Sequence, residues 1–288
     1  MKNIHKNNKI INTIEIPKPI LISGKILQSI SSRLATLFAA KLFSTPLKFK
    51  VPERELMMRE SAKNKLIRID AIKKKVMVYT YGYSKKKVLL VHGWSGRGTQ
   101  LYQIADKILE NKMMVVSFDA PAHGLSSGKN TTMIDFVKSI QQIDKEFGPF
   151  EAAIGHSFGG MSLLNSISEG LKLNSLVIIG ADNSIPEIIK SFVKKIELKP
   201  GIAGKLESYY NKKLGIKMED HSSQKAAINV KIPTLVIHDS EDRFVPVSSA
   251  ISIRQNLKYG ELLITNGLGH HKIFKDKQII QRILEFIK

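Results

Sequence analysis

Short apolar runs alternate with amphipathic segments over most of the chain. Runs typical of buried strands occur at residues 88–91, 113–118, 152–154, 176–179, 234–237 and 261–264. Apolar residues recur with helical spacing at residues 101–109, 133–147 and 279–287. Short buried strands that alternate with helices predict a mostly parallel sheet with helices on both faces. The expected fold class is therefore α/β.

Helical spacing also occurs near the N-terminus, in residues 20–43. Apolar side chains recur there at every fourth position, namely Ile22, Ile26, Ile30, Leu34 and Phe38. Basic residues flank this stripe, so we predict a basic amphipathic helix. Such a helix suits peripheral contact with a membrane surface. The alternative is that it packs on the main domain or on a second subunit.

Two boundaries follow from these patterns. Residues 1–75 are predicted to form a basic N-terminal extension, and residues 76–288 the α/β domain. More than fifty residues separate the runs that end at 179 and begin at 234. That length exceeds one helix with its two loops. We therefore predict a small helical cap inserted at about residues 183–230, which would cover an active site.

Charge narrows the choice of partners. The 288-residue chain has a formal net charge of +20, and residues 1–75 hold 17 Lys or Arg against 5 Asp or Glu. A basic arm suits an anionic surface, although lysine also serves solubility. Aromatic residues make up only 7% of the chain and the basic residues are scattered, so no nucleic-acid partner is expected. The pattern leaves the oligomeric state open.

The chain contains no cysteine, which excludes disulfides, thiolate catalysis and metal sites ligated by Cys. Its basic beginning is not followed directly by an apolar stretch, and no run of about 18 uncharged apolar residues occurs. We expect neither a signal peptide nor a spanning helix. The expected location is the cytoplasm, with membrane association left open.

One serine stands in a motif that carries chemistry. Gly155-His156-Ser157-Phe158-Gly159 matches G-x-S-x-G, follows an apolar run and precedes a helical segment. A serine on so sharp a turn needs small residues two positions before and after it, hence Gly155 and Gly159. The alternative is a Gly-rich turn that binds phosphate, but neither G-x-x-x-x-G-K-[ST] nor G-x-G-x-x-G occurs. Ser157 is the candidate nucleophile.

Four further segments stand in order around this motif. They are HGWSG at 92–96, DAPAHGLS at 119–126, HDSEDRFVP at 238–246 and GLGHH at 267–271. With GHSFGG at 155–160, they make residues 76–288 resemble the α/β-hydrolase superfamily of serine esterases and lipases. Ala122 departs from the family pattern, which commonly has glycine there.

The resemblance implies a triad in the chain order Ser, Asp, His. It selects Asp242 as the acid and His270 as the base, with Asp239, Glu241 and Asp182 as alternative acids. A neutral imidazole activates the serine hydroxyl, and a buried carboxylate orients that imidazole.

The resemblance also implies an oxyanion hole formed by two backbone N–H groups. The expected donors are the amides of Trp94 and Phe158. His92, which precedes this turn, is interpreted as a buried histidine satisfied by backbone hydrogen bonds.

A metal site is the competing interpretation of the histidines. His238, His270 and His271 with Asp242 could form one, but no H-E-x-x-H spacing is present. We expect neither a metal nor another cofactor. The sequence thus predicts a serine hydrolase acting on a small-molecule ester or related acyl bond. The alternative is a catalytically silent protein of the same fold that binds a partner or a membrane.

Overall fold

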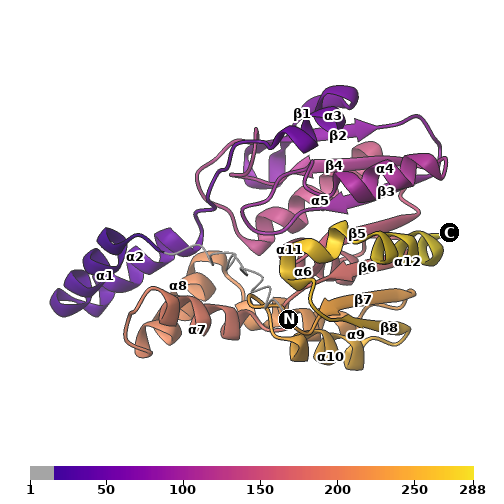
Figure 1. Cartoon of the computed structure of the whole chain (residues 1–288). Coiled ribbons are helices and arrows are strands. Elements are labelled where there is room, and N and C mark those ends of the chain that lie inside the picture. The colour runs from indigo at the N-terminus through magenta and orange to yellow at the C-terminus, as the bar shows by residue number, and fades with distance from the viewer. Residues whose placement is uncertain (1–15) are drawn as a thin grey trace, which may run out of the picture.

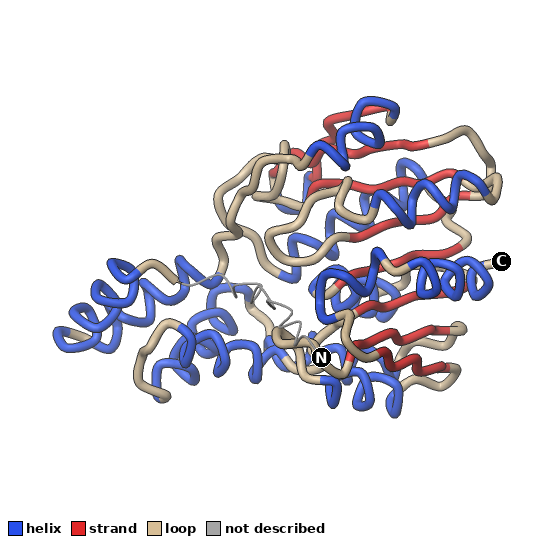
Figure 2. Tube along the Cα trace, viewed as in Figure 1, coloured by secondary structure: helices blue, strands red, loops and turns tan. Residues whose placement is uncertain are grey.

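The computed structural model describes residues 16–288, and its centre is an eight-stranded sheet (Figures 1 and 2). The strand order is β1-β2-β4-β3-β5-β6-β7-β8. Strand β2 is antiparallel to both β1 and β4, whereas all other neighbours are parallel. The predicted mostly parallel sheet is confirmed. The strands are β1 (Lys63–Ile69), β2 (Lys74–Tyr81), β3 (Lys87–Val91), β4 (Met114–Asp119), β5 (Ala152–His156), β6 (Ser175–Ile179), β7 (Thr234–Asp239) and β8 (Gly260–Thr265).

Helices cover both faces of the sheet and bury a separate apolar cluster on each. On one face α5 and α6 pack through Phe136, Ile140 and Leu163. On the other face α4 and α12 pack through Ile104 and Ile283. The helices longer than one turn are α1 (Lys18–Ile30), α2 (Ser32–Phe43), α3 (Leu56–Ser61), α4 (Tyr102–Glu110), α5 (Met133–Phe147), α6 (Phe158–Ser168), α7 (Ile185–Lys195), α8 (Gly201–Leu214), α9 (Ser223–Ile228), α10 (Val247–Asn256) and α12 (Lys277–Ile287). The one-turn helix α11 (Gly269–Lys272) precedes α12.

The N-terminal segment differs from its prediction in two respects. The single helix expected over residues 20–43 is broken at Ser31, whose extended backbone ends α1 and whose hydroxyl accepts from the amide of Arg33 at the start of α2. The predicted boundary at residues 75 and 76 falls inside β2. Strand β1, which precedes it, buries Ile67 and Ile69 against the helices, so the extension contributes a strand to the sheet. The first 15 residues of the extension lie outside the described residues.

A helical lobe projects from one end of the sheet, at the left of Figures 1 and 2. It consists of α1 and α2 together with α7 and α8 from the interval between β6 and β7. Phe43 of α2 packs against Phe192 of α7, with ring centroids 5.1 Å apart. The Tyr210 hydroxyl of α8 donates to the Ala40 carbonyl, at 2.7 Å. Within residues 16–288, no helix combines the length and apolar character needed to cross a membrane.

Candidate active site

The turn between β5 and α6 holds Ser157 in a strained backbone conformation. Its φ is +52° and its ψ is −119°, a combination rarely adopted by a residue with a side chain. The Ser157 amide donates to the Ile179 carbonyl of β6 at 2.8 Å. The Ser157 carbonyl accepts from the amide of Gly160, at 3.0 Å, within the first turn of α6. The surrounding chain therefore fixes a conformation that serine alone would avoid.

Close backbone packing explains the two glycines of this turn. A Cβ on Gly155 would lie 2.6 Å from the amide nitrogen of Gly160. A Cβ on Gly159 would collide with the backbone carbonyls of Val91 and His92. Both neighbours are main chain, which cannot turn aside as a side chain can. The predicted need for small residues around Ser157 therefore has a direct physical cause.

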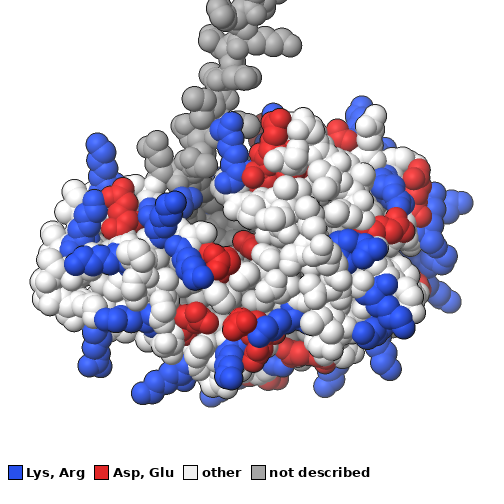
Figure 3. Space-filling model, turned by 90° about the horizontal axis from the view of Figure 1, so that it is seen from below, with Lys and Arg blue, Asp and Glu red and all other residues white. Residues whose placement is uncertain are grey.

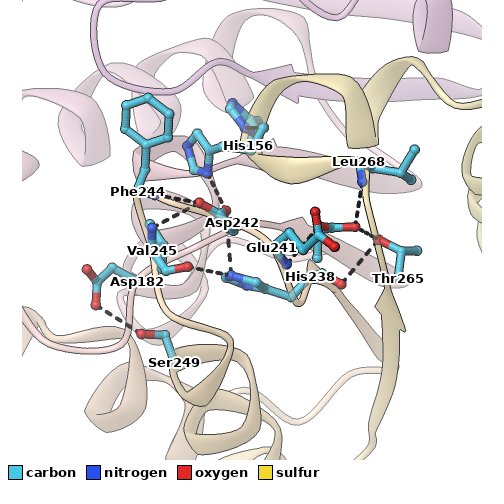
Figure 4. A network of polar contacts seen from close by, with 12 residues as sticks. His156, Asp182, His238, Glu241, Asp242, Phe244, Val245, Ser249, Thr265 and Leu268 are labelled. Carbon is cyan, nitrogen blue, oxygen red and sulfur yellow. Dashed lines mark hydrogen bonds and ion pairs between the residues drawn. The ribbon is translucent and has the colours of Figure 1, made fainter. Parts of the chain in front are cut away.

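Asp242 and His270, predicted from separate segments, meet in the folded chain. The Nδ1 atom of His270 lies 2.6 Å from Oδ2 of Asp242. The other carboxylate oxygen of Asp242 accepts from the amides of Phe244 and Val245, at 2.8 and 3.0 Å (Figure 4). The Asp242 side chain is almost fully buried, at 1% exposure. This network holds the carboxylate in one orientation toward the imidazole.

Hydrogen bonding keeps that carboxylate ionised. Burial by itself raises the pKa of Asp242, but the bond from His270 and those from the two backbone amides outweigh it, so the pKa lies below its usual value. An ionised carboxylate only accepts hydrogen bonds, so Nδ1 of His270 carries the proton between them. The other ring nitrogen, Nε2, is then left as an acceptor.

His156 connects the serine turn to the His270 loop. It precedes Ser157, and its Nε2 donates to the His270 carbonyl at 2.9 Å. The two imidazole rings lie 4.7 Å apart. Within residues 16–288, Ser157 Oγ makes no hydrogen bond to His270. The structure thus brings His270 into bonding contact with Asp242 and places it beside the serine turn.

The two amides predicted for the oxyanion hole are available as donors. Among the described residues, neither the Trp94 nor the Phe158 amide donates a hydrogen bond to a protein acceptor. Phe158 is the first residue of α6, where amides have no partner inside the helix. The two side-chain rings contact each other, with centroids 5.4 Å apart, and both line the same cavity.

That cavity joins the serine turn to the helical lobe. It has a volume of about 370 Å³ and is lined mostly by apolar atoms, within the range common for ligand pockets. Ser157, Trp94 and Phe158 line it from the sheet side. Phe244, which follows the predicted acid, also lines it and contacts the His270 ring at 5.2 Å. Its other walls include Leu42, Phe43, Ile188, Phe192, Tyr210 and Met218.

Buried groups stabilise the loops that follow β3 and β4, next to the predicted oxyanion hole. The His92 Nε2 accepts from the Ala120 amide and its Nδ1 lies 2.7 Å from the Gly93 carbonyl, as expected for a structural histidine. Ala122 has a φ of +67°, so alanine adopts the left-handed conformation at a position where the family commonly has glycine. Its buried methyl group offsets part of that strain.

The alternative acids lie apart from His270. Asp182 lines the cavity, accepts from its own turn and from Ser249, and has a raised pKa because of burial (Figure 4). Asp239 is buried at the end of β7 and accepts from the Leu268 amide and the Thr265 hydroxyl, at 3.0 and 2.7 Å. It therefore ties down the loop that carries His270. The sequence pattern does not predict this role for Asp239, although an acid at the end of a buried strand is a signal for it.

Two other histidines of the site were also not assigned a role. His238 is fully buried, bonds the Val245 carbonyl at 3.0 Å and lies 3.6 Å from Oδ2 of Asp242. His271, by contrast, is exposed. No group of three or more His, Asp or Glu suited to a metal ion occurs in residues 16–288.

Comparison with known proteins agrees with this geometry. A family model described as "Alpha/beta hydrolase family" matches residues 88–208. Among curated proteins, the AB hydrolase superfamily protein YisY of Bacillus subtilis (strain 168) is 29% identical over 70 residues, or 24% of this chain. That match spans only about a quarter of the relative, 26% of its length.

Solved structures extend the likeness to most of the chain. The esterase EaEST of Exiguobacterium antarcticum has a TM-score of 0.62 at 15% identity, covering 78% of this chain and 99% of its own. An esterase of Pyrococcus furiosus has a TM-score of 0.63 at 17% identity, covering 85% and 96%. A bacterial membrane phospholipase A has a TM-score of 0.62 at 16% identity, covering 94% and 98%. At these identities the likeness concerns the fold.

The family match, the curated relative and the shared fold agree with the order of motifs around Ser157. On this basis the chain has the α/β-hydrolase fold, and residues 88–208 match the model of the α/β-hydrolase family.

Proposed function

We propose that this chain is a serine hydrolase, like a carboxylesterase or lipase, that cleaves an ester or related acyl bond through an acyl-enzyme on Ser157. The family match over residues 88–208 and the fold shared with esterases support a hydrolase. The strained backbone of Ser157, at the wall of an apolar cavity, is the observation that carries the proposal. Strain of this kind costs on the order of 1–3 kcal/mol and clusters at functional sites.

The proposed base is His270, and the proposed orienting acid is Asp242. Because Asp242 accepts the Nδ1 proton, the neutral Nε2 of His270 takes the proton of Ser157 Oγ as that oxygen bonds to the substrate carbonyl carbon. The carbonyl oxygen then gains a negative charge. The amides of Trp94 and Phe158 are the proposed donors to this oxyanion.

The tetrahedral intermediate then breaks its ester C–O bond. The imidazolium of His270 gives its proton to the leaving oxygen, so an alcohol departs and an acyl ester of Ser157 remains. Water, deprotonated by the same imidazole, attacks this ester and releases the carboxylic acid. The serine hydroxyl is restored, and these steps require no cofactor.

The proposed substrate is a small-molecule ester with an apolar acyl group. The apolar walls that α7 and α8 contribute support the role of the inserted helices as a cap over the site. Phe192 of α7 and Tyr210 of α8 both line the cavity. Cytoplasmic location and membrane contact through residues 20–43 stay predictions.

A silent binding protein of the same fold is the alternative. It would not need a strained serine beside an Asp–His pair, since neither adds to the stability of a binding surface. Among the described residues, the Trp94 and Phe158 amides have no protein acceptor, which leaves both available to an oxyanion.

Labelling with a fluorophosphonate probe tests the proposal. The wild type should be labelled, and Ser157→Ala should not, because only an activated serine attacks the phosphorus. Ser191→Ala is a matched control, since Ser191 lines the same cavity away from the turn, and it should be labelled like the wild type. Failure of the folded wild type to react, with no hydrolysis of nitrophenyl esters, would favour the binding protein.

A further inference from the structure

Helix α1 and the beginning of α2 present apolar side chains to solvent. Ile22, Ile26 and Ile30 are 56, 54 and 68% exposed, and they repeat at every fourth position of α1. Leu34 and Leu37 continue the exposed series beyond the break at Ser31, at 42 and 43%. Single exposed apolar residues are ordinary, but five on one helical hairpin form a patch.

The opposite sides of the same helices are also apolar, and they are already occupied. Gly24 of α1 is buried close to Phe38 and to Leu198 of the cap segment. Ala35 and Ala39 of α2 are fully buried in the core. An apolar face of a helix is normally covered by another element, a subunit or lipid. Within residues 16–288 no segment covers the exposed isoleucines, so this face is open to a second partner.

Charge identifies that partner. Residues 18–43 and 185–217, which form most of the lobe, hold twelve Lys or Arg and three Asp or Glu, a formal charge of +9. Residues 18–43 contain no acidic residue. Lys and Arg side chains project around this lobe, at the left of Figure 3. An apolar surface with a basic surround is complementary to anionic lipid, and it is poorly suited to an equally basic second copy.

The same hairpin reaches the cavity of the candidate active site. Leu42 and Phe43, at the end of α2, form part of the cavity wall. The ten residues from Leu34 to Phe43 span about 14 Å of helix. The exposed leucines and the cavity wall therefore lie on one short helix.

We propose that the outer surface of α1 and α2, defined by Ile22, Ile26, Ile30, Leu34 and Leu37, docks the protein on an anionic phospholipid membrane. The docked hairpin brings the cavity to the lipid surface, so that the substrates are acyl esters held in the membrane. This second statement rests on the proposed function, whereas docking itself does not. Docking is peripheral, because the helices lie in the interface.

Vesicle co-sedimentation of the full chain tests docking directly. The wild type should bind vesicles of phosphatidylglycerol and phosphatidylcholine in equal parts, and should bind phosphatidylcholine alone much more weakly. Replacing Ile22, Ile26 and Ile30 together by serine should lower partitioning about tenfold or more, because each change removes apolar area from the interface. Replacing Lys18, Arg33 and Lys41 by glutamine should weaken binding and its dependence on salt.

A matched variant controls for the general effect of removing exposed apolar residues. Met57, Leu66 and Ile264 are 61, 48 and 45% exposed on α3, β1 and β8, outside the lobe. Replacing these three by serine should leave vesicle binding unchanged. Equal partitioning of the isoleucine variant and the wild type would overturn the docking surface. A second outcome would also overturn it. In that outcome the wild type binds no vesicles and sediments as a dimer, and the isoleucine variant sediments as a monomer.

Activity separates the two statements. On soluble nitrophenyl butyrate the isoleucine variant should match the wild type, while its hydrolysis of vesicle-borne phosphatidylglycerol should fall in parallel with its binding. Ser157→Ala should bind vesicles normally and hydrolyse neither substrate. If the wild type binds vesicles and cleaves the soluble ester but never the lipid, the proposed substrate class is wrong and the proposed function stands.

Discussion

Two regions meet at the cavity of this protein, and they hold their residues in different ways. At the carboxyl edge of the sheet, Ser157 has a strained backbone and Asp242 is fixed by three hydrogen bonds. In the helical lobe, Phe43 and Phe192 contribute ring surfaces, and neighbouring isoleucines are open to solvent. Hydrogen bonds and main-chain packing fix the positions of individual atoms at the edge, whereas the lobe requires only apolar surface of suitable volume.

This difference matches two kinds of task. Bond making requires reacting groups to be held within a fraction of an ångström, so it depends on main-chain packing and on buried, fully paired polar atoms. Acyl-chain or membrane contact is governed by apolar area, which tolerates small shifts. Single changes at the edge should therefore act strongly on rate or stability, and similar changes in the lobe should act weakly.

The largest expected effect is that of Asp242→Asn on turnover. An amide at this position favours the wrong tautomer of His270 and cannot stabilise its cation, which in a related triad costs about 10⁴-fold in kcat. We expect a loss of that order with an unchanged fold, measured as kcat on a soluble nitrophenyl ester. Asp182→Asn is the control, since Asp182 also lines the cavity but does not contact His270. A larger loss for Asp182→Asn would indicate that Asp182, and not Asp242, is the orienting acid.

Gly159→Ala should reduce stability rather than turnover alone. The added Cβ would collide with the main-chain carbonyls of Val91 and His92, so β3 or α6 must shift. Overpacking of this kind costs about 3 kcal/mol in the free energy of unfolding. In the lobe, a Cβ on Gly201 would meet nothing within 4 Å. Gly201→Ala should therefore change the free energy of unfolding by less than about 1 kcal/mol. Urea denaturation of both variants would measure the contrast.

The edge was largely predictable because its rules are local. A serine between two glycines, after an apolar run, specifies a strand, a sharp turn and a helix. The structure indeed has β5, Ser157 and α6 in that order. Asp242 and His270 came from separate segments, and the parallel sheet brings their loops to one edge. The bracing by Asp239 was not predicted, since it depends on how two loops meet.

The lobe was less predictable because its contacts join distant segments. The periodicity of residues 20–43 indicated helix, but it did not show that a capping hydroxyl at Ser31 would divide it. Nor did it show that Phe43 would meet a ring about 150 residues later in the chain. Apolar periodicity reveals that a face needs a partner and does not identify the partner.

Acidification should lower the free energy of unfolding through two buried histidines near the carboxyl edge of the sheet. Burial lowers the pKa of His92 to about 4 and that of His123 to about 3, whereas both titrate near 6.5 in the unfolded chain. The unfolded state therefore binds more protons below pH 6.5, so stability is full above that pH and is lost as the pH falls. Between pH 7 and pH 5 each histidine should cost about 2 kcal/mol.

Urea denaturation at pH 7 and pH 5 would measure this loss. The Ser95 amide donates a hydrogen bond to Nε2 of His123. His123→Gln keeps polar atoms near this amide but cannot titrate. Its stability should therefore fall about 2 kcal/mol less than that of the wild type between the two pH values. Equal losses in the two proteins would show that folding does not lower the pKa of His123.

The smallest expected effect is a gain, and it lies in the lobe. Gly204 is exposed in the interior of α8, and a Cβ there would meet nothing within 4 Å. Alanine loses less conformational entropy than glycine on forming a helix, so Gly204→Ala should raise the free energy of unfolding by about 0.5–1 kcal/mol. Turnover of a soluble ester should stay unchanged, because Gly204 does not line the cavity. A loss of stability would mean that α8 has a partner on this side, and the lobe would then be as closely packed as the edge.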